Sequence, residues 1–231
     1  MAGDRIAGRD YREVTVKDRG LYVEGNHSST LSQKKQSDGE ADTAARKILI
    51  LAANPKNSSR LHLDKEVKAI DDGLRRSLYR ERFALTSKWA VTTQDFYRHM
   101  LDLKPHIVHF CGHGEGEKGI VLEDSGGRTE LLGVDAIAEL FRLFAKEGLE
   151  CVVLNACHSE VQADAIVRHV PYAIGMSQEI GDEAATVFAV AFYDALGAGR
   201  GIEFAFELGC SQLVVLKEHE TPVLYRRQYR L

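Results

Sequence analysis

The stretch KPHIVHFCGHGEG, residues 104–116, decides the fold that we expect of this chain. Its run from Ile107 to Cys111 is short, apolar and uninterrupted, which is typical of a parallel strand buried on both faces. The run ends in a turn where His113 lies between two glycines. A second stretch, VVLNACHS at 152–159, follows the same plan, with an apolar strand that leads to Cys157. The two stretches predict a sheet that carries a histidine and a cysteine.

Similar apolar runs alternate with amphipathic segments from Lys47 onward. We predict strands over residues 48–53, 82–89, 107–111, 151–156, 173–176 and 223–225, and a small strand and turn over 119–127. We predict helices near residues 61–80, 93–103, 133–147, 160–169, 182–197 and 201–210. This alternation indicates an α/β domain with a mainly parallel central sheet flanked by helices.

The carboxyl edge of such a sheet is where functional groups gather, because there the strands turn into loops. His113 and Cys157 both emerge at this edge. A free thiol is only a few per cent ionised at neutral pH, so a catalytic cysteine needs a nearby base or a positive environment. His113 can supply the imidazole. The segment Ser159 to Gln162 resembles a capping box, which would start a helix and turn its positive end towards the thiol.

The glycines beside His113 let backbone and substrate approach closely. The N–H groups of Gly114 and Cys157 are therefore expected to form an oxyanion hole, which stabilises the charge of a tetrahedral intermediate. These features together predict nucleophilic catalysis by a cysteine with a histidine base.

The pattern of a strand ending in His-Gly and a later strand ending in Ala-Cys resembles the caspase-like peptidase clan of caspases, metacaspases, legumain, gingipain and separase. More closely, the chain resembles the CHAT domain in the segments ILAANP (50–55), LDKEVKAI (63–70), KPHIVHFCGHG (104–114), GIVLED (119–124), VVLNACHS (152–159), AIGMSQEIGDEAA (173–185) and FAVAFYDALGAG (188–199). The resemblance covers about residues 47–225. It implies a caspase-like three-layer sandwich and a dyad of His113 and Cys157.

The specificity pocket is less well defined by the resemblance. In clan members that cut after arginine or lysine, an aspartate two positions before the cysteine commonly lines the pocket for the side chain before the cut bond, called P1. Here this position holds Asn155, whose neutral amide can hydrogen-bond a cation without neutralising it. Asp182 and Asp124 are candidates to replace the missing charge.

Other residues of the same stretches have simpler interpretations. His109 shares a strand face with Ile107 and Cys111, so it is expected to be a paired core histidine. His158 should point away from Cys157, because neighbouring side chains leave an extended segment in opposite directions.

Metal and nucleotide sites have weaker support. The pairs Cys111/His113 and Cys157/His158 lack the usual spacing of zinc ligands. The glycine-rich segments at 112–116 and 197–201 match no nucleotide-binding motif. We therefore expect neither a metal nor an organic cofactor. The four carboxylates Asp64, Glu66, Asp71 and Asp72 lie on an amphipathic helix, and the simplest interpretation is its solvated face.

Composition limits the classes of partner. The 231 residues are 44% hydrophobic, enough for one substantial core, and the net charge of −4 arises from 30 basic and 34 acidic residues without a large basic patch. Nucleic acid is thus not expected as a partner. No apolar run approaches the roughly 20 residues that span a bilayer, and no signal peptide is evident, so we expect a cytoplasmic protein with reduced cysteines and no membrane partner.

Residues 1–46 differ from the rest in composition and form a predicted amino-terminal extension, with the catalytic domain at 47–231. Short strands are predicted at 11–16 and 21–23, and the polar segment 28–42 reads as a flexible linker. By resemblance, CHAT proteases act in prokaryotic conflict and cell-suicide systems and stay idle until a sensor or a cleavage event triggers them. The extension is therefore a candidate for binding a sensor or NTPase partner.

The function expected from the sequence is that of a cysteine endopeptidase acting on protein substrates through a thioester acyl-enzyme. Two alternatives stay open at this point. One is a catalytically idle, caspase-like interaction module that serves as an adaptor for a sensor protein. The other is a cysteine-dependent transferase or hydrolase of small molecules.

Overall fold

The computed structural model describes residues 12–16 and 45–229. The strands are β1 (Arg12–Val16), β2 (Arg46–Ala52), β3 (Phe83–Trp89), β4 (Ile107–Cys111), β5 (Ile120–Glu123), β6 (Thr129–Leu132), β7 (Cys151–Asn155), β8 (Tyr172–Met176) and β9 (Pro222–Tyr229). The α-helices are α1 (Leu63–Arg76), α2 (Thr93–Leu103), α3 (Val134–Phe144), α4 (Glu160–Ile166), α5 (Asp182–Gly197) and α6 (Ile202–Gln212). The predicted strands and helices from residue 47 onward are thus present, with ends that shift by a few residues.

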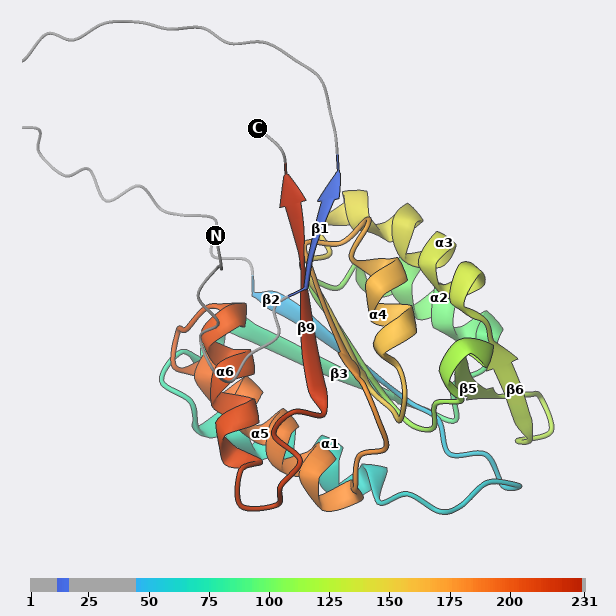
Figure 1. The fold of residues 1–231 in the computed structure, drawn as a ribbon, viewed down its shortest axis with the longest axis horizontal. Helices are drawn as coiled ribbons and strands as arrows, with labels where there is room; N and C mark the ends of the chain where they lie inside the picture. Colours follow the sequence, from blue (N-terminus) through green and yellow to red (C-terminus); the bar gives the residue numbers. More distant parts are fainter. Residues whose placement is uncertain (1–11, 17–44, 230–231) are drawn as a thin grey trace, which may run out of the picture.

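A seven-stranded sheet in the order β1-β9-β8-β7-β4-β2-β3 forms the middle layer. Strands β8, β7, β4, β2 and β3 run parallel to their neighbours in that list, whereas β9 is antiparallel to β8. Figure 1 shows the sheet between two groups of helices. The predicted α/β class with a mainly parallel central sheet is confirmed.

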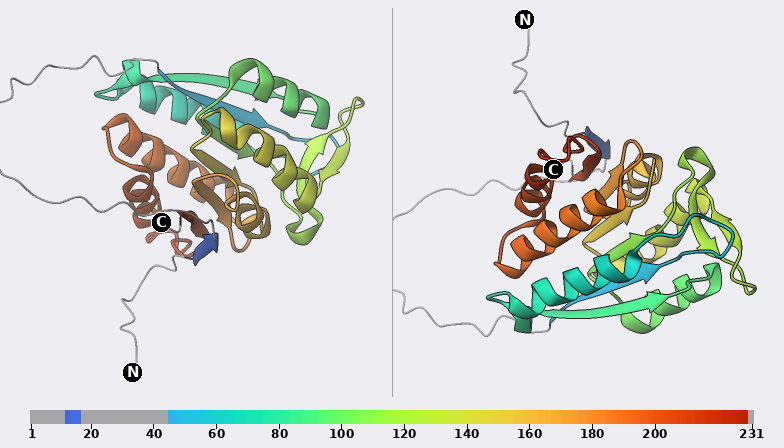
Figure 2. Two further views of the ribbon diagram at one scale, coloured as in Figure 1. Left: turned by 90° about the horizontal axis from the view of Figure 1, so that it is seen from above. Right: turned by 90° about the horizontal axis from the view of Figure 1, so that it is seen from below.

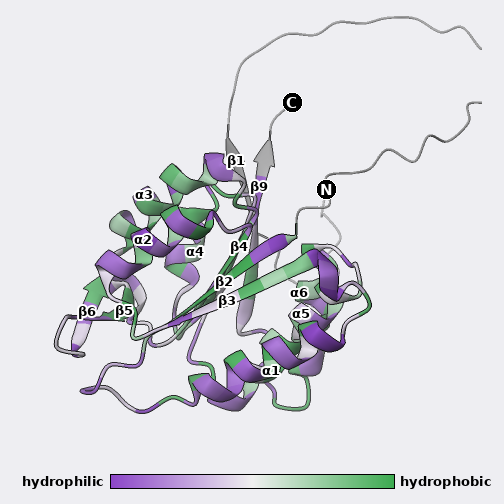
Figure 3. Ribbon diagram, turned by 180° about the vertical axis from the view of Figure 1, so that it is seen from behind, coloured by the Kyte–Doolittle hydropathy of each residue, from purple (hydrophilic) through white to green (hydrophobic). Residues whose placement is uncertain are grey.

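Each face of the sheet has its own core, because alternate side chains of a buried strand point to opposite faces. Ile48 and Ile50 of β2 pack with the apolar sides of α1, α5 and α6, and Leu49 and Leu51 pack with those of α2, α3 and α4. Both views in Figure 2 place α1 beside α5, and Figure 3 shows that the helices combine hydrophilic and hydrophobic residues. The result is a three-layer sandwich.

The amino-terminal extension contributes one described strand. β1, within the strand predicted at 11–16, pairs in parallel with β9 at the edge of the main sheet, with Arg12 opposite Tyr225. The strand predicted at 21–23 and the linker predicted at 28–42 lie outside the described residues. The small strand and turn predicted after β4 is the antiparallel pair β5–β6.

Within the described part of the chain, every helix is too short or too polar to cross a bilayer.

Candidate active site

Strands β4 and β7 lie side by side and bring the two predicted catalytic residues to one edge of the sheet. Cys111 pairs with Asn155 in the parallel register, so the turns that hold His113 and Cys157 start at the same level. The backbones beyond the strands also meet. A Cβ atom added to Gly114 would lie 2.1 Å from the carbonyl oxygen of Cys157. Glycine at position 114 is therefore what allows the two turns to pack together.

A main-chain carbonyl selects which ring nitrogen of His113 carries a proton. His113 Nε2 lies 2.8 Å from the carbonyl oxygen of Ser59. Because this oxygen can only accept, Nε2 carries the proton and donates it. Nδ1 is therefore the ring nitrogen that is left to accept a proton, as a general base must.

His113 and Cys157 line one cavity at this edge. Its lining also includes residues of the loop before α1, of α1 itself and of the start of α5: Leu61, His62, Leu63, Glu66, Gly112, Asn155, Ala156, Ile180, Asp182, Ala185 and Thr186. The Cys157 side chain is half-buried, and its Sγ lies 3.9 Å from the carbonyl oxygen of Ile180. The thiol is thus reachable from the cavity that contains the imidazole.

Two backbone amides near the thiol are unused. Glu115 N donates to Gly119 O, and Val121 N donates to His113 O, one bond on each side of Gly114. Among the described residues, no main-chain carbonyl accepts from the N–H of Gly114 or of Cys157. Backbone N–H groups that are free beside a nucleophile are suited to binding an oxyanion.

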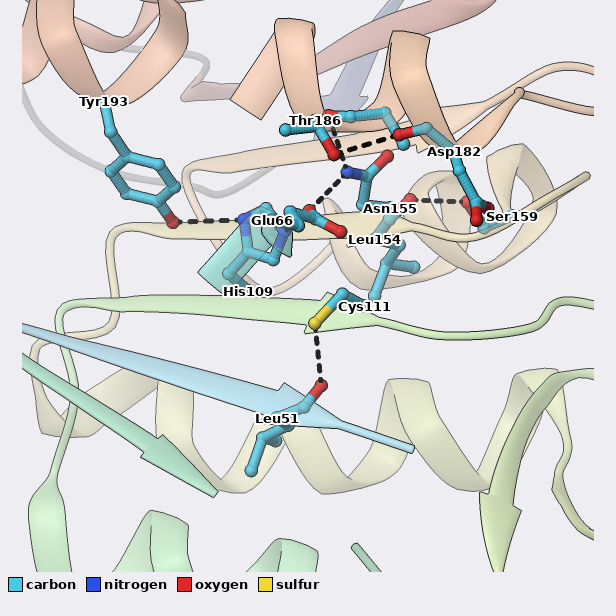
Figure 4. A network of polar contacts seen from close by, with 11 residues as sticks. Leu51, Glu66, His109, Cys111, Leu154, Asn155, Ser159, Asp182, Thr186 and Tyr193 are labelled. Carbon is cyan, nitrogen blue, oxygen red and sulfur yellow. Dashed lines mark hydrogen bonds and ion pairs between the residues drawn. The ribbon is translucent and has the colours of Figure 1, made fainter. Parts of the chain in front are cut away.

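A buried polar network lies directly beneath the cavity (Figure 4). Glu66 Oε1 accepts from His109 Nε2 at 2.9 Å and from Asn155 Nδ2 at 2.6 Å. Tyr193 completes the chain, with its hydroxyl 3.2 Å from His109 Nδ1. Asn155 Nδ2 also donates to Ala185 O at 3.1 Å.

This network corrects one interpretation of the sequence and bears out another. Glu66 is not part of a solvated face, because only 5% of its side chain is exposed and it faces β4. Its spacing placed it among the apolar positions Leu63, Val67 and Ile70, which is the signal that could have revealed its burial. His109 is fully buried and paired, as predicted for a core histidine.

The other predicted pocket residues have different positions. Asn155 and Asp182 line the cavity. Asp182 Oδ2 accepts from the His62 amide at 3.2 Å, across the cavity mouth. Asp124 lies outside the cavity lining, in the turn between β5 and β6, where its Oδ1 accepts from the amides of Gly126 and Arg128 at 2.8 Å each. These amide bonds hold the pKa of Asp124 below its usual value.

The predicted capping box after Cys157 is absent, although α4 does begin at Glu160. The Ser159 side chain makes no cap bond; its Oγ donates to Leu154 O at 2.8 Å and accepts from Met176 N at 3.0 Å. Gln162 Nε2 donates to Gly116 O at 2.6 Å instead of turning back to the cap. Both side chains thus fix the loops around the site, because tertiary partners replaced the local ones.

The remaining histidine and cysteines lie away from the cavity. His158, at φ 53°, is exposed and outside its lining. Burial raises the pKa of the Cys111 and Cys151 thiols well above the usual range. Cys210, on α6, is partly exposed but does not line the cavity, so Cys157 is the cysteine that the cavity offers to a substrate. No group of three or more His, Cys, Asp or Glu side chains in the described part of the chain is arranged to hold a metal ion.

Two proteins with related sequences are named as proteases. A Roc-COR-CHAT protease from an unknown prokaryotic organism is 26% identical over 200 residues, covering 81% of this chain and 19% of the relative. A probable protease of Gillisia limnaea is also 26% identical over 200 residues, covering 79% of this chain and 35% of the relative. The chain thus spans only a fifth to about a third of these curated relatives.

Solved structures with the same fold are cysteine proteases. A secreted C11 cysteine protease from Bacteroides thetaiotaomicron, in complex with an irreversible peptide inhibitor, has a TM-score of 0.52 and 13% identity, covering 70% of this chain and 56% of that chain. The Arg-specific cysteine proteinase gingipain R has a TM-score of 0.57 and 12% identity, covering 79% of this chain and 46% of that chain. These likenesses show the caspase-like fold.

The model of the CHAT domain family matches residues 14–228, which is nearly the whole chain. The match begins earlier than the resemblance found in the sequence, and it includes most of β1. The chain therefore belongs to the CHAT domain family, with the fold of the caspase-like cysteine proteases.

Proposed function

We propose that the chain is a cysteine endopeptidase in which Cys157 is the nucleophile and His113 the general base. The observation that carries this proposal is the single cavity lined by both residues, in which the bond from His113 Nε2 to Ser59 O leaves Nδ1 as the nitrogen that can accept a proton. Nucleophilic catalysis needs a thiol, a base and a way to keep the base in the right tautomer. Each of the three has a named group here.

The reaction then follows from these groups. Cys157 Sγ attacks the carbonyl carbon of the substrate, and its proton goes to His113 Nδ1. The carbon–nitrogen bond breaks as His113 returns the proton to the leaving amine, and a thioester remains. Water attacks the thioester with its proton taken by His113, which releases the acid product and restores the thiol.

The oxyanion of each tetrahedral intermediate is stabilised by the N–H groups of Gly114 and Cys157. Both amides are free of main-chain partners, as described above. Removing one donor from such a hole typically slows catalysis by about 100- to 1000-fold. Asn155 and Asp182 belong to the substrate pocket of the same proposal, because both line the cavity.

We place this protease among triggered effectors of prokaryotic defence or cell death. The relative named Roc-COR-CHAT protease is prokaryotic, and both relatives are much longer than this chain. The contact of Asp182 with the His62 amide, which closes the cavity mouth, is consistent with an enzyme held idle. Residues 1–46 are then the proposed binding segment for a sensor or NTPase partner.

Digestion of a denatured protein such as casein tests the proposal. Wild type and the matched control His158→Ala should produce fragments, whereas Cys157→Ala and His113→Ala should not. If wild type and His158→Ala are as inactive as the other two variants, both alone and with the additional segments of the longer relatives fused to the chain, the idle interaction module is favoured. Turnover of small thioesters without any protein cleavage would favour the small-molecule enzyme.

A further inference from the structure

The floor of the cavity beside Cys157 contains a buried hydrogen-bond acceptor that has no donor. Glu66 lines the cavity and uses its Oε1 for both His109 and Asn155. Asn155 is 96% buried, lines the same cavity, and its Oδ1 has no hydrogen-bond partner among the described residues. Leaving a buried acceptor unpaired is costly, so such a group in a cavity points to a ligand that donates.

The polar groups of this floor are arranged around the Glu66 carboxylate. Burial raises the pKa of Tyr193 well above its ordinary value, so the phenol keeps its proton. We assign this proton to the bond with His109 Nδ1, the acceptor 3.2 Å away. His109 then donates its Nε2 proton to Glu66. Glu66 is therefore a buried carboxylate with two N–H donors, and neither lysine nor arginine takes part in this network.

The rest of the lining adds no lysine or arginine. Apart from His62 and His113, its titratable groups are Cys157 and a second carboxylate, Asp182. A buried charge without a counter-charge is costly, so proteins normally pair it. The missing member of the pair is a cation that enters with the substrate.

We propose that this cavity is the P1 pocket and takes an arginine or lysine side chain, with Glu66 as the principal counter-charge and Asn155 Oδ1 as an additional acceptor. This inference rests on the proposed function, because it needs Cys157 to attack the bond after P1. Glu66 comes from α1, so it replaces the charge that the neutral Asn155 lacks at the end of β7. An acidic P1 side chain is repelled by the same floor.

The mouth of the cavity must open for a side chain of that size. The cavity measures about 40 Å³, and Asp182 Oδ2 accepts from the His62 amide across its rim. The His62 ring also lies 3.5 Å from this oxygen. Entry of the P1 side chain parts this contact and frees the Asp182 carboxylate for the incoming cation. Asp182 is thus a second, more exposed acid of the pocket.

Matched peptides with arginine or citrulline at P1 test this proposal. Citrulline has nearly the shape of arginine without its charge. The wild type is expected to have a higher kcat/KM for the arginine peptide, and Glu66→Gln should reduce the arginine-to-citrulline ratio by about 10- to 100-fold, the loss of a charge-assisted hydrogen bond. Asp182→Asn, at an exposed site, should reduce the ratio by about 2- to 5-fold. The control Asp72→Asn removes one charge from the outer side of α1 and should leave the ratio unchanged.

Different results would contradict the assignment of the pocket and the proposed protease function. Equal cleavage of both peptides by the wild type, faster cleavage after aspartate, or an unchanged ratio in Glu66→Gln and Asp182→Asn would overturn the assignment of the pocket while the protease stands. If Glu66→Gln fails to fold, as judged by circular dichroism, the ratio in Asp182→Asn decides. If no peptide is cut and no peptide acyloxymethyl ketone labels Cys157, either in the chain alone or with the longer relatives' additional segments fused to it, the proposed function itself fails.

Discussion

The contact between Gly114 and Cys157 gives a sharp prediction, because a single methyl group would separate the two catalytic turns. The Cβ of Gly114→Ala would lie 2.1 Å from Cys157 O, whereas ordinary van der Waals contact begins near 3.4 Å. The turns must therefore part by about 1.3 Å, the difference between these distances. A misplacement of about 1 Å can cost about 100-fold in rate. Overpacking at such a site also typically costs about 1–3 kcal/mol of stability.

The assay compares kcat/KM of wild type and Gly114→Ala on one peptide, with urea unfolding of both proteins. We expect a loss of about 100-fold in kcat/KM with a folded variant. Gly201→Ala is the matched control, because a Cβ there meets nothing within 4 Å; its activity should stay within about twofold of wild type, as for most surface substitutions. Activity of Gly114→Ala within the same range would refute the claim that the packing of these turns positions the dyad.

Three further predictions concern the network, the thiols and a helix cap. Glu66→Ala leaves the buried donors of His109 and Asn155 without an acceptor and should lower the free energy of unfolding by about 2–5 kcal/mol, whereas an unchanged urea midpoint would contradict the network. Iodoacetamide at pH 8 should modify Cys157 and spare Cys111 and Cys151, because burial raises the pKa values of these two thiols. Mass spectrometry of the digested protein measures the labelling, and modification of Cys111 or Cys151 before Cys157 would contradict the prediction. Thr92→Ala removes the cap of α2 and should cost about 1 kcal/mol at pH 7. The bond from Thr92 lowers the pKa of Asp95 in the folded state. The stabilisation by Asp95 is therefore complete above its unfolded pKa and is lost as pH falls through the folded pKa. The free energy of unfolding of Asp95→Asn should thus differ from that of wild type at pH 7 and converge with it in acid.

The central sheet could be predicted from the sequence because each buried strand is a continuous apolar run. The strand from Ile107 to Cys111 has one polar residue, His109 at its centre, and the strand from Cys151 to Asn155 has one at its end, Asn155. All ten residues are buried in the structure. Turns at the ends of neighbouring parallel strands must lie close together, which is why His113 and Cys157 could be placed at one edge. These predictions needed only local pattern and one general rule of topology.

Side-chain contacts with residues far apart in the sequence could not be predicted from local sequence patterns. Glu66 was assigned to the solvated face of α1 by residue type, although its partners His109 and Asn155 come from strands β4 and β7. Ser159 matched a local cap motif, yet its hydroxyl bonds to Leu154 and Met176. A carboxylate or hydroxyl has several possible partners, and the fold decides among them.

The tautomer of His113 is a similar case. It depends on the carbonyl of Ser59, which lies in the loop before α1 and carries no side-chain signature for this role. Any residue at position 59 presents the same main-chain oxygen, so no sequence motif could have revealed the contact.

The most direct test of the central claim is to map the site that a peptide acyloxymethyl ketone labels on the folded chain. The probe imitates a substrate and forms a thioether with the nucleophilic cysteine. Our account predicts labelling at Cys157, absence of labelling at Cys210, and a much slower reaction in His113→Ala than in His158→Ala. Labelling spread over both cysteines, or a rate that does not depend on His113, would contradict the Cys157–His113 dyad.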